Sequence, residues 1–431
     1  MRTTLWQAAA IVLALICNYS CNSGQPQNEH QSLQTEKELT AKNILGNPDY
    51  LAISFGGYRE KSRDIQPTVD QLKEDMKILA AMNIKILRTY NVKLAHASNV
   101  LKAIHAIKQE DPNFEMYVML GAWIDCENAW TAHPNHDKED DKGNAAEIQR
   151  AVDLANQYPD IVKIIAVGNE AMVKWAASYF VQPWVILKYV NQLQEFKKAG
   201  KLPKDLWVTC SDNFASWGGG GSEYHVEDLN KLIKAVDYIS VHTYPMHDTH
   251  YNPDFWGTFN GEEDLTKIEK INAAMTRSRD YAISQYESVV EYIKGLGVDK
   301  PVHIGETGWA SFSNEHYGPE GSRATDEYKE GLYYKMMREW TNEHGVSCFY
   351  FEAFDEIWKD ANNPGGSENH FGLFTINGQA KYAIWDLVDQ GVFTGLRRGE
   401  NAIVKTYKGN EQALLQQVLL PPVKAGMAVG N

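Results

Sequence analysis

The segment VKIIAVGNE, from Val162 to Glu170, decides the predicted fold. Up to Val167 it is apolar except for one lysine, and it lacks the strict polar alternation of a strand that faces water on one side. Strands buried on both faces have this pattern, which is typical of a parallel sheet covered by helices. A glycine, an asparagine and a glutamate follow directly, where this strand is expected to end.

Similar apolar runs recur along the chain, separated by stretches with helical periodicity. The other runs are Tyr50–Phe55, Ile84–Tyr90, Met116–Trp123, Trp207–Ser211, Tyr238–Tyr244, Val302–Gly305 and Val346–Phe351. The helical stretches are Val69–Met82, Ala97–Gln109, Ala145–Gln157, Trp184–Lys198, Val226–Ala235, Ile268–Ile293, Glu327–Glu343 and Tyr382–Leu387. About eight β–α units in series predict an α/β fold, a closed (β/α)8 TIM barrel. An open doubly wound sheet is the alternative, but the segment after the first strand, Phe55–Tyr58, lacks the glycine spacing of a phosphate-binding turn.

The composition narrows the class of protein. The 431 residues carry a net charge of −14, and an acidic surface repels phosphate backbones, so we expect no nucleic acid partner. The 12 Trp and 22 Tyr residues could fill the core or stack on sugar rings. Cys126, Cys210 and Cys348 are an odd number within the body of the chain, which argues against a disulfide framework. No Cys or His spacing indicates a zinc site, so we expect no metal or cofactor. We also expect the protein to be a monomer.

The N-terminus has the features of an export signal. Arg2 precedes an apolar run, Ala8–Ile16, that is too short to cross a bilayer as a helix. Ser20-Cys21-Asn22 then begins a polar stretch, which resembles a bacterial lipoprotein signal in which Cys21 becomes the lipidated residue; Cys17 is a weaker alternative. We expect export and a lipid anchor on a bacterial membrane, at the outer membrane or the periplasmic face. Secretion after simple cleavage is the alternative.

These features predict four parts of the chain. Residues 1–21 are the expected signal peptide, residues 22–43 a polar linker, residues 44–390 the catalytic barrel, and residues 391–431 an extension packed on the barrel. Two polar insertions, Cys126–Asn144 and Met246–Leu265, follow the third and sixth predicted strands. Both lie at the strand ends where such barrels build their sites. They could block one end of a cleft and favour exo action or short oligosaccharides.

Two glutamates end predicted strands. Glu170 follows the fourth strand, and Glu306, in HIGETGW, ends the seventh. Either could be a helix-start residue stabilised by the helix dipole. On a closed barrel, however, the ends of the fourth and seventh strands face each other across the mouth, where partial desolvation raises a carboxyl pKa. Two carboxyl groups placed in this way can flank one glycosidic bond, so the pair predicts a glycoside hydrolase.

The wider set of motifs resembles glycoside hydrolase family 17, the family of β-1,3-glucanases and β-glucan transglycosylases. The motifs that carry the resemblance are Leu87–Asn91, Val167–Glu170, Tyr244-Pro245, Gly305–Trp309, Phe351–Lys359 and Glu368–Phe374, which together extend over roughly residues 50 to 390. The resemblance implies cleavage of β-1,3-glucosidic bonds in laminarin-type β-glucans or their oligosaccharides. The alternative is transglycosylation, in which a sugar hydroxyl replaces water as acceptor.

The resemblance also implies roles for individual residues. Glu170 would be the acid/base and Glu306 the nucleophile of a retaining, double-displacement mechanism. Substrate contacts are expected from Asn169, which would bind the 2-hydroxyl of the reacting sugar, from Tyr244, which would orient Glu306, and from Tyr90, Trp309, Phe354, Glu356 and Lys359. Charge pairing between Glu356 and Lys359 is an alternative, structural role. Further stacking candidates, each of which could instead belong to the core, are Tyr58, Trp123, Trp217 and Trp358.

Other classes of barrel protein fit the sequence less well. A metal-dependent amidohydrolase needs a His-x-His pair at the end of the first strand, and Ser54–Tyr58 contains no histidine. A barrel that only binds glycan would not need both glutamates together with Asn169 and Tyr244. An enzyme acting on β-1,4-linked glucan or mannan would share the two glutamates but not the surrounding motifs.

Overall fold

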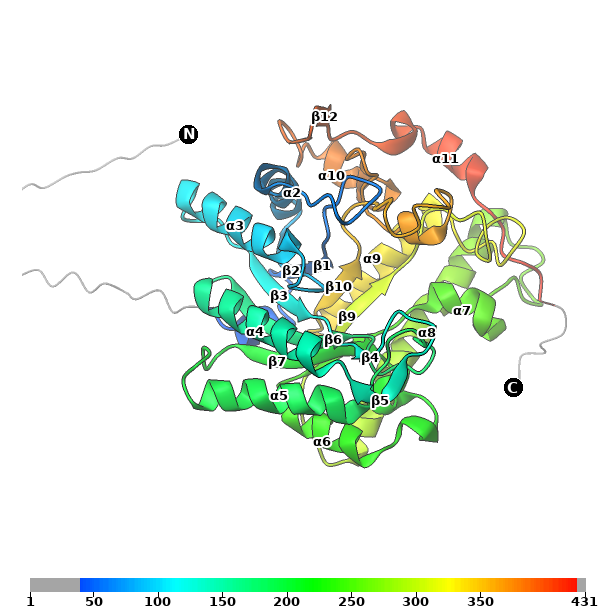
Figure 1. The fold of residues 1–431 in the computed structure, drawn as a ribbon. Helices are drawn as coiled ribbons and strands as arrows, with labels where there is room; N and C mark the ends of the chain where they lie inside the picture. Colours follow the sequence, from blue (N-terminus) through cyan, green and yellow to red (C-terminus); the bar gives the residue numbers. More distant parts are fainter. Residues whose placement is uncertain (1–38, 425–431) are drawn as a thin grey trace, which may run out of the picture. The chain divides into compact units, whose positions relative to one another are not determined.

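The computed structural model describes residues 39–424. Within them, parallel strands close into a barrel in the order β1-β10-β9-β8-β7-β6-β3-β2, so each barrel strand pairs with its neighbours in sequence and the last pairs with the first (Figure 1). The barrel strands are β1 (Leu51–Ser54), β2 (Ile84–Arg88), β3 (Tyr117–Ala122), β6 (Val162–Asn169), β7 (Trp207–Asn213), β8 (Ile239–His242), β9 (Val302–Gly308) and β10 (Cys348–Phe351). The predicted (β/α)8 barrel is confirmed, and β6 and β9 are its fourth and seventh strands.

The strands form where apolar and β-branched residues are consecutive, because both faces are covered. The register that closes the barrel pairs Ile53 with Tyr350 on one side and with Leu87 on the other. Side chains that point inward form a core of their own, separate from the core between the strands and the helices. It contains Ala52, Ile86, Tyr117, Met119, Ile164, Ala166, Tyr238 and Phe349. A filled interior of this kind forces the site to the strand ends.

Helices surround the strands, and in Figure 1 α3, α4, α5 and α6 follow one another around β3, β6 and β7. The longer helices are α2 (Val69–Ala81), α3 (Ala95–Glu110), α4 (Asp141–Gln157), α5 (Pro183–Lys198), α6 (Glu227–Ala235), α8 (Lys267–Gly295) and α9 (Glu327–Glu343). These bounds agree closely with the predicted stretches. The start signal of α2 is a capping box, in which the Thr68 hydroxyl accepts from Gln71 N and the Gln71 side chain accepts from Thr68 N.

Both insertions contain secondary structure that the sequence did not predict. The first holds a hairpin, β4 (Cys126–Glu127) paired with β5 (Asn135–Glu139). The second holds α7 (Pro245–Tyr251) and a 3-10 turn, η3 (Pro253–Phe255). Short polar segments such as these carry little periodicity, so only their contacts with the barrel reveal them. Between β7 and α6 lie a π-helical turn, η1 (Ala215–Gly219), and η2 (Ser222–Tyr224).

The predicted linker is too long at its C-terminal end. A short helix, α1 (Ala41–Ile44), precedes the first strand, and its Ala41 and Ile44 are fully buried. They join the inner core next to Tyr50 and Trp207, which stand at the starts of strands. Residues 41–43 therefore belong to the folded domain, because the helix that contains them buries Ala41 and Ile44 against the strand starts, at the end of the barrel opposite the site.

The last part of the described chain packs on the barrel domain. It contains η5 (Tyr382–Ile384), α10 (Trp385–Asp389), β11 (Arg397–Arg398), β12 (Asn401–Ala402), η6 (Thr406–Gly409) and α11 (Glu411–Gln417). Arg398 Nε donates to Asp75 Oδ1 of α2 at 3.0 Å, and both side chains are buried. This ion pair ties the segment after residue 391 to the barrel.

The expected signal peptide, Cys21, most of the linker and the last seven residues lie outside the described residues. Between residues 39 and 424, no helix is long and apolar enough to cross a membrane. Cys126, Cys210 and Cys348 are buried free thiols.

Candidate active site

Glu170 and Glu306 lie at the C-terminal ends of β6 and β9. Glu170 directly follows β6 with φ +45°, and its backbone N donates to Ser211 O at 3.0 Å. The chain reaches this turn through Gly168, whose φ is +81° and where a Cβ would lie 2.9 Å from the Cβ of Ala171. Glycine adopts such a conformation without strain. The turn that aims Glu170 therefore depends on the glycine before it.

His242, the last residue of β8, connects the two carboxyl groups. Its Nδ1 lies 3.0 Å from Glu170 Oε1 and 3.3 Å from Glu306 Oε2, and its Nε2 lies 2.8 Å from Ser211 Oγ. Burial lowers the pKa of His242 to about 4, so its ring is neutral at pH 7. The network is satisfied when Nδ1–H donates to the carboxyl groups and Nε2 accepts from the Ser211 hydroxyl.

Glu306 is surrounded by donors. Arg88 Nη1 donates to its Oε2 at 2.8 Å, while the hydroxyls of Tyr244 and Tyr90 donate to its Oε1 at 2.9 and 3.2 Å. Burial by itself would raise the pKa of Glu306, but the positive charge of Arg88 and these contacts hold it below its usual range. Glu306 is therefore ionised at neutral pH.

Glu170 has the opposite protonation state. Burial and then the negative charge of Glu306 raise the pKa of Glu170 to about 8. The chain just after Glu170 is fixed by a hydrogen bond from Met172 N to the buried Asp212 Oδ2 at 2.8 Å. At neutral pH the pair therefore consists of one protonated and one ionised carboxyl group, separated by a neutral histidine.

Asn169 and the two tyrosines also meet at this point. The Asn169 side-chain oxygen accepts a hydrogen bond from Arg88 Nη2, so one guanidinium positions both Asn169 and Glu306. The Tyr90 ring packs against the same guanidinium, with its centroid 4.7 Å from Arg88 Cζ. The structure thus brings Tyr90, Asn169 and Tyr244 together with both glutamates.

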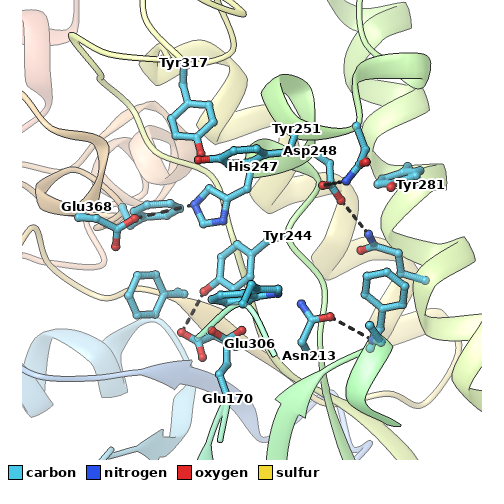
Figure 2. A pocket seen from close by; sticks show the side chains of 17 residues that line it. Glu170, Asn213, Tyr244, His247, Asp248, Tyr251, Tyr281, Glu306, Tyr317 and Glu368 are labelled. Carbon is cyan, nitrogen blue, oxygen red and sulfur yellow. Dashed lines mark hydrogen bonds and ion pairs between the residues drawn. The ribbon is translucent and has the colours of Figure 1, made fainter. Parts of the chain in front are cut away.

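A cavity of about 850 Å³ opens next to the pair and extends toward α7 and α8 (Figure 2). Glu170, Glu306 and Tyr244 line it together with aromatic and polar side chains. The other lining residues are Trp175, Asn213, Phe214, Ala215, His247, Asp248, Tyr251, Asn252, Tyr281, Gln285, Tyr317, Phe351, Glu368 and Phe371. This size and composition suit a polar ligand with apolar faces.

Glu356 and Lys359 lie in a buried ion cluster beyond β10. Lys359 Nζ lies 2.5 Å from Glu352 Oε1 and 3.9 Å from Glu356 Oε2. Glu356 also accepts from Tyr58 N at 3.1 Å and from Trp358 Nε1 at 2.8 Å. None of these residues lines the cavity. The contacts of Glu356 and Lys359 are therefore those of a buried ion cluster, which is the structural role that the sequence left open for them.

The structure corrects the expectation that Trp309 and Phe354 stack on sugar. Trp309 is 0% exposed and its Nε1 donates to Ala324 O, while Phe354 is 1% exposed and stacks on Phe374. Both rings fill the core between strands and helices, because the strand-end motifs that contain them turn inward. Of the other candidates, Tyr58 and Trp217 are buried, and Trp123 and Trp358 are half-buried.

Sequence reasoning missed several residues of the site. Arg88 and His242 were within predicted strands but were not assigned a role, although a buried arginine at a strand end indicates a carboxylate partner. Trp175, which lines the cavity and is 64% exposed, stands in a loop without any local pattern. Trp130 is 60% exposed and stacks on Tyr179, at the hairpin of the first insertion.

Within the described residues, no group of three or more His, Cys, Asp or Glu side chains could hold a metal ion. By their protonation states, Glu170 is suited to proton transfer and Glu306 to nucleophilic attack. A closed barrel with such a pair of carboxyl groups at its mouth defines the class of glycoside hydrolases.

Comparison with known proteins assigns the family. Residues 52–372 match the BtgE/BtgC glycoside hydrolase domain, so the chain belongs to this family. It is 68% identical to an endo-laminarinase from Formosa Hel1_33_131, with a TM-score of 0.90 over 91% of this chain and 100% of that one. The expected resemblance to glycoside hydrolase family 17 is confirmed.

More distant relatives share parts of the chain. A glucan 1,3-beta-glucosidase of Arthroderma benhamiae is 26% identical over 273 residues, which are 62% of this chain and 70% of that protein. The chain spans only 37% and 36% of two longer fungal relatives. A glycoside hydrolase family 17 beta-1,3-glucanosyltransferase from Rhizomucor miehei shares the fold, with 21% identity and a TM-score of 0.54 over 78% of this chain and 96% of that one.

Proposed function

We propose that the protein hydrolyses β-1,3-glucosidic bonds in laminarin-type β-glucans with retention of configuration. The observation that carries the proposal is the pairing of a protonated Glu170 with an ionised Glu306 across one histidine nitrogen. The high identity to an endo-laminarinase supports the substrate class and favours attack within the glucan chain.

The separation of the two carboxyl groups supports a double displacement. One oxygen of each carboxyl group contacts the same His242 Nδ1, at 3.0 Å for Glu170 and 3.3 Å for Glu306, so the two groups lie close together, as in retaining enzymes, where they are about 5–5.5 Å apart. Glu306 attacks the anomeric carbon, and the bond to the leaving oxygen breaks as Glu170 transfers its proton to that oxygen. Water then gives a proton to Glu170 and displaces Glu306 from the sugar.

The neighbouring side chains support these steps. Arg88 and the tyrosine hydroxyls keep Glu306 ionised before attack, and Tyr244 holds the orientation of its Oε1. Asn169, positioned by Arg88, offers its amide to the 2-hydroxyl of the reacting sugar. Glu356 and Lys359 act on substrate only indirectly, because their charges are paired with each other and with Glu352.

The direct test is incubation of the purified protein with laminarin and with β-1,3-gluco-oligosaccharides, with the products separated by size and their anomeric form followed by NMR. We expect shorter products with β-configuration at the new reducing end. Products longer than the substrate would show that a sugar hydroxyl replaces water. Release of α-anomers, or no cleavage of any β-1,3-glucan, would overturn the proposal.

We also propose that the protein is exported as a monomer and carries a lipid on Cys21; the N-terminal sequence supports the lipid anchor. In a bacterial host, metabolic labelling with a fatty acid should mark the wild type and not Cys21→Ser. Fractionation should then move the variant from the membrane to the soluble fraction. Equal labelling of both proteins would refute the anchor, and light scattering of the soluble variant would test the monomer.

A further inference from the structure

Two buried serines on neighbouring strands form a chain with His242. Ser211 of β7 and Ser240 of β8 are paired in register, and both are 0% exposed. Their Oγ atoms lie 2.9 Å apart, and Ser211 Oγ lies 2.8 Å from His242 Nε2. A Cβ on Gly305 of β9 would collide with both hydroxyl groups, so this glycine leaves the space that the serines fill. Neither serine lines the cavity, so the chain can act on the reaction only through His242.

The surroundings of His242 place its single proton on Nδ1. Burial lowers the pKa of His242 to about 4, so at pH 7 only one of its two ring nitrogens is protonated. Nδ1 lies 3.3 Å from Glu306 Oε2, and an ionised carboxylate can only accept a hydrogen bond. At the other side of the ring, the Ser211 hydroxyl can donate to Nε2. The charged or titratable groups that act on the ring come from four strands: Glu170 after β6, Glu306 of β9, Arg88 of β2 and Asp212 of β7.

The position of this proton matters for the acid. With the proton on Nε2, Nδ1 would be an acceptor, and the protonated Glu170 would donate to it. The proton that the leaving oxygen needs would then be held by the histidine. With the proton on Nδ1, Glu170 Oε1 accepts at 3.0 Å, and the acid proton stays on Oε2.

The negative charge of the site changes place during a double displacement. Before attack, Glu306 is ionised and Glu170 is protonated. In the glycosyl-enzyme, Glu306 is bonded to the sugar and neutral, and Glu170 is ionised because it has given up its proton. Arg88 pairs with Glu306, so its charge opposes this movement. His242 Nδ1 is within hydrogen-bond reach of both carboxyl groups, so its N–H can serve either state.

We propose that His242 is a positioning residue whose Nδ1–H donates to whichever of Glu170 and Glu306 carries the negative charge. The proposal rests on the proposed function, since the charge changes place in this way only in a double displacement. Ser211, held in turn by Ser240, fixes the ring at Nε2, and Nδ1 therefore keeps its place between the two carboxyl groups.

The test measures two ionisations, one in each state of the enzyme. The acidic limb of the pH profile of kcat/KM on laminarin reports Glu306 in the free enzyme. A 2-deoxy-2-fluoro β-laminaritrioside traps the glycosyl-enzyme, and the pH dependence of its hydrolysis, followed by intact mass, reports Glu170 as the base. Each carboxyl group must be ionised in the state where it is measured.

His242→Leu and His242→Asn should differ in both measurements. A donor favours the ionised carboxyl group, so its loss in His242→Leu raises the pKa of that group. Both limbs should then move to higher pH by about one unit, the value of one hydrogen bond to a charged group. His242→Asn keeps an N–H near the position of Nδ1, and both limbs should stay where they are in the wild type.

Variants of β7 test the serine chain. Ser211→Ala frees the ring at Nε2 and should move both limbs in the same direction as His242→Leu, by a smaller amount. It also provides both measurements if His242→Leu does not fold. Thr209→Val is the matched control, since Thr209 is equally buried and its Oγ1 donates to Tyr238 O at 2.7 Å, away from His242. It should move neither limb, and melting temperatures verify the fold of each variant.

The outcomes separate the two proposals. A limb that moves in only one state would mean a donor fixed on one carboxyl group, and this would overturn the shared role of His242. Equal shifts in His242→Leu and His242→Asn, or none in His242→Leu, would overturn it too. If the fluorinated glycoside traps no covalent intermediate and laminarin is not cleaved, the proposed function itself fails.

Discussion

Two pairs of buried glutamates lie at strand ends of this barrel, and they differ in where the positive charge stands. In the pair at the cavity, Arg88 contacts Glu306 at 2.8 Å, whereas no Lys or Arg of residues 39–424 forms an ion pair with Glu170. In the pair beyond β10, Lys359 lies against both Glu352 and Glu356. The first pair opens on the cavity, and the second does not line it.

The position of the positive charge distinguishes a pair of glutamates suited to catalysis from a pair that forms a structural ion cluster. Arg88, on the side of Glu306, holds the pKa of that carboxyl group below its usual range, whereas burial and then the negative charge of Glu306 raise the pKa of Glu170. One protonated and one ionised carboxyl group suit an acid and a nucleophile. Burial raises the pKa values of both Glu352 and Glu356, and the shared lysine opposes this in both. A cation shared by two carboxyl groups holds them together without giving them different roles.

The largest expected effect comes from Glu306→Gln. The amide keeps the size of the side chain but cannot attack the anomeric carbon, so kcat for laminarin should fall by at least about 10³-fold. Glu343→Gln, at the exposed end of α9, is the matched control and should retain full activity. Initial rates of reducing-end release measure both variants. If Glu306→Gln kept most of its turnover, Glu306 would not be the nucleophile, and the glutamate pair at the cavity would not be the catalytic pair.

Arg88→Met should lower kcat/KM about 10²-fold, because it removes the cation that pairs with Glu306 and keeps it ionised. In the wild type, kcat/KM should rise with pH as Glu306 ionises below its usual pKa and fall as Glu170 ionises near pH 8. Without the guanidinium the pKa of Glu306 rises, so the acidic limb moves to higher pH. The pH profile measures this shift. Arg279→Met, whose arginine pairs with Asp280 on the surface, should not move either limb.

Lys359→Met tests the second pair through stability. It leaves two buried carboxyl groups without their cation, which should destabilise the fold by about 3–5 kcal/mol. Thermal unfolding at pH 7 measures the loss, and the double variant Glu352→Gln with Lys359→Met should recover part of it. Lys335→Met removes an exposed ion pair and should cost less than about 1 kcal/mol. An unchanged melting temperature with strongly reduced activity would instead make Lys359 a substrate residue.

The smallest expected effect is that of Trp175→Ala. The ring is exposed to the cavity that the catalytic pair shares, so its loss should lower kcat/KM for long oligosaccharides by about three- to tenfold through lost stacking. The melting temperature should stay within about 1–2 °C, because an exposed ring adds little to the core. Trp184→Ala, on α5 and outside the cavity, is the control. Equal effects of the two variants on kcat/KM would remove Trp175 from the site.

Much of the fold could be predicted because its signals are local. The barrel strands lie within a few residues of the apolar runs, since a strand buried on both faces must be apolar throughout. The helices follow their periodicity, and α2 begins at the threonine that caps it. The positions of Glu170 and Glu306 followed from closure, which places the ends of the fourth and seventh strands around one mouth.

Exposure could not be predicted in the same way. Trp309 and Trp175 are both tryptophans near a catalytic glutamate, yet one is fully buried and the other mostly exposed. The difference depends on which way the chain turns after the strand, and nothing within a few residues of either ring encodes that direction. The helix in the second insertion was missed for a related reason, because its seven residues carry too few apolar positions to show a period.

The sequence by itself determined the barrel, the two glutamates and the family, because apolar periodicity and strand-end motifs act over short stretches of chain. The tertiary structure alone decided that Arg88 from β2 and His242 from β8 meet Glu306, and thus that the pKa of Glu306 is lowered while that of Glu170 is raised. It alone placed Gln285 of α8 against Asp248 of α7, where Gln285 Nε2 donates to the Asp248 carboxylate at 3.1 Å. Protonation states and unsatisfied groups depend on charges and donors brought together from distant segments, so they arise only when the barrel closes.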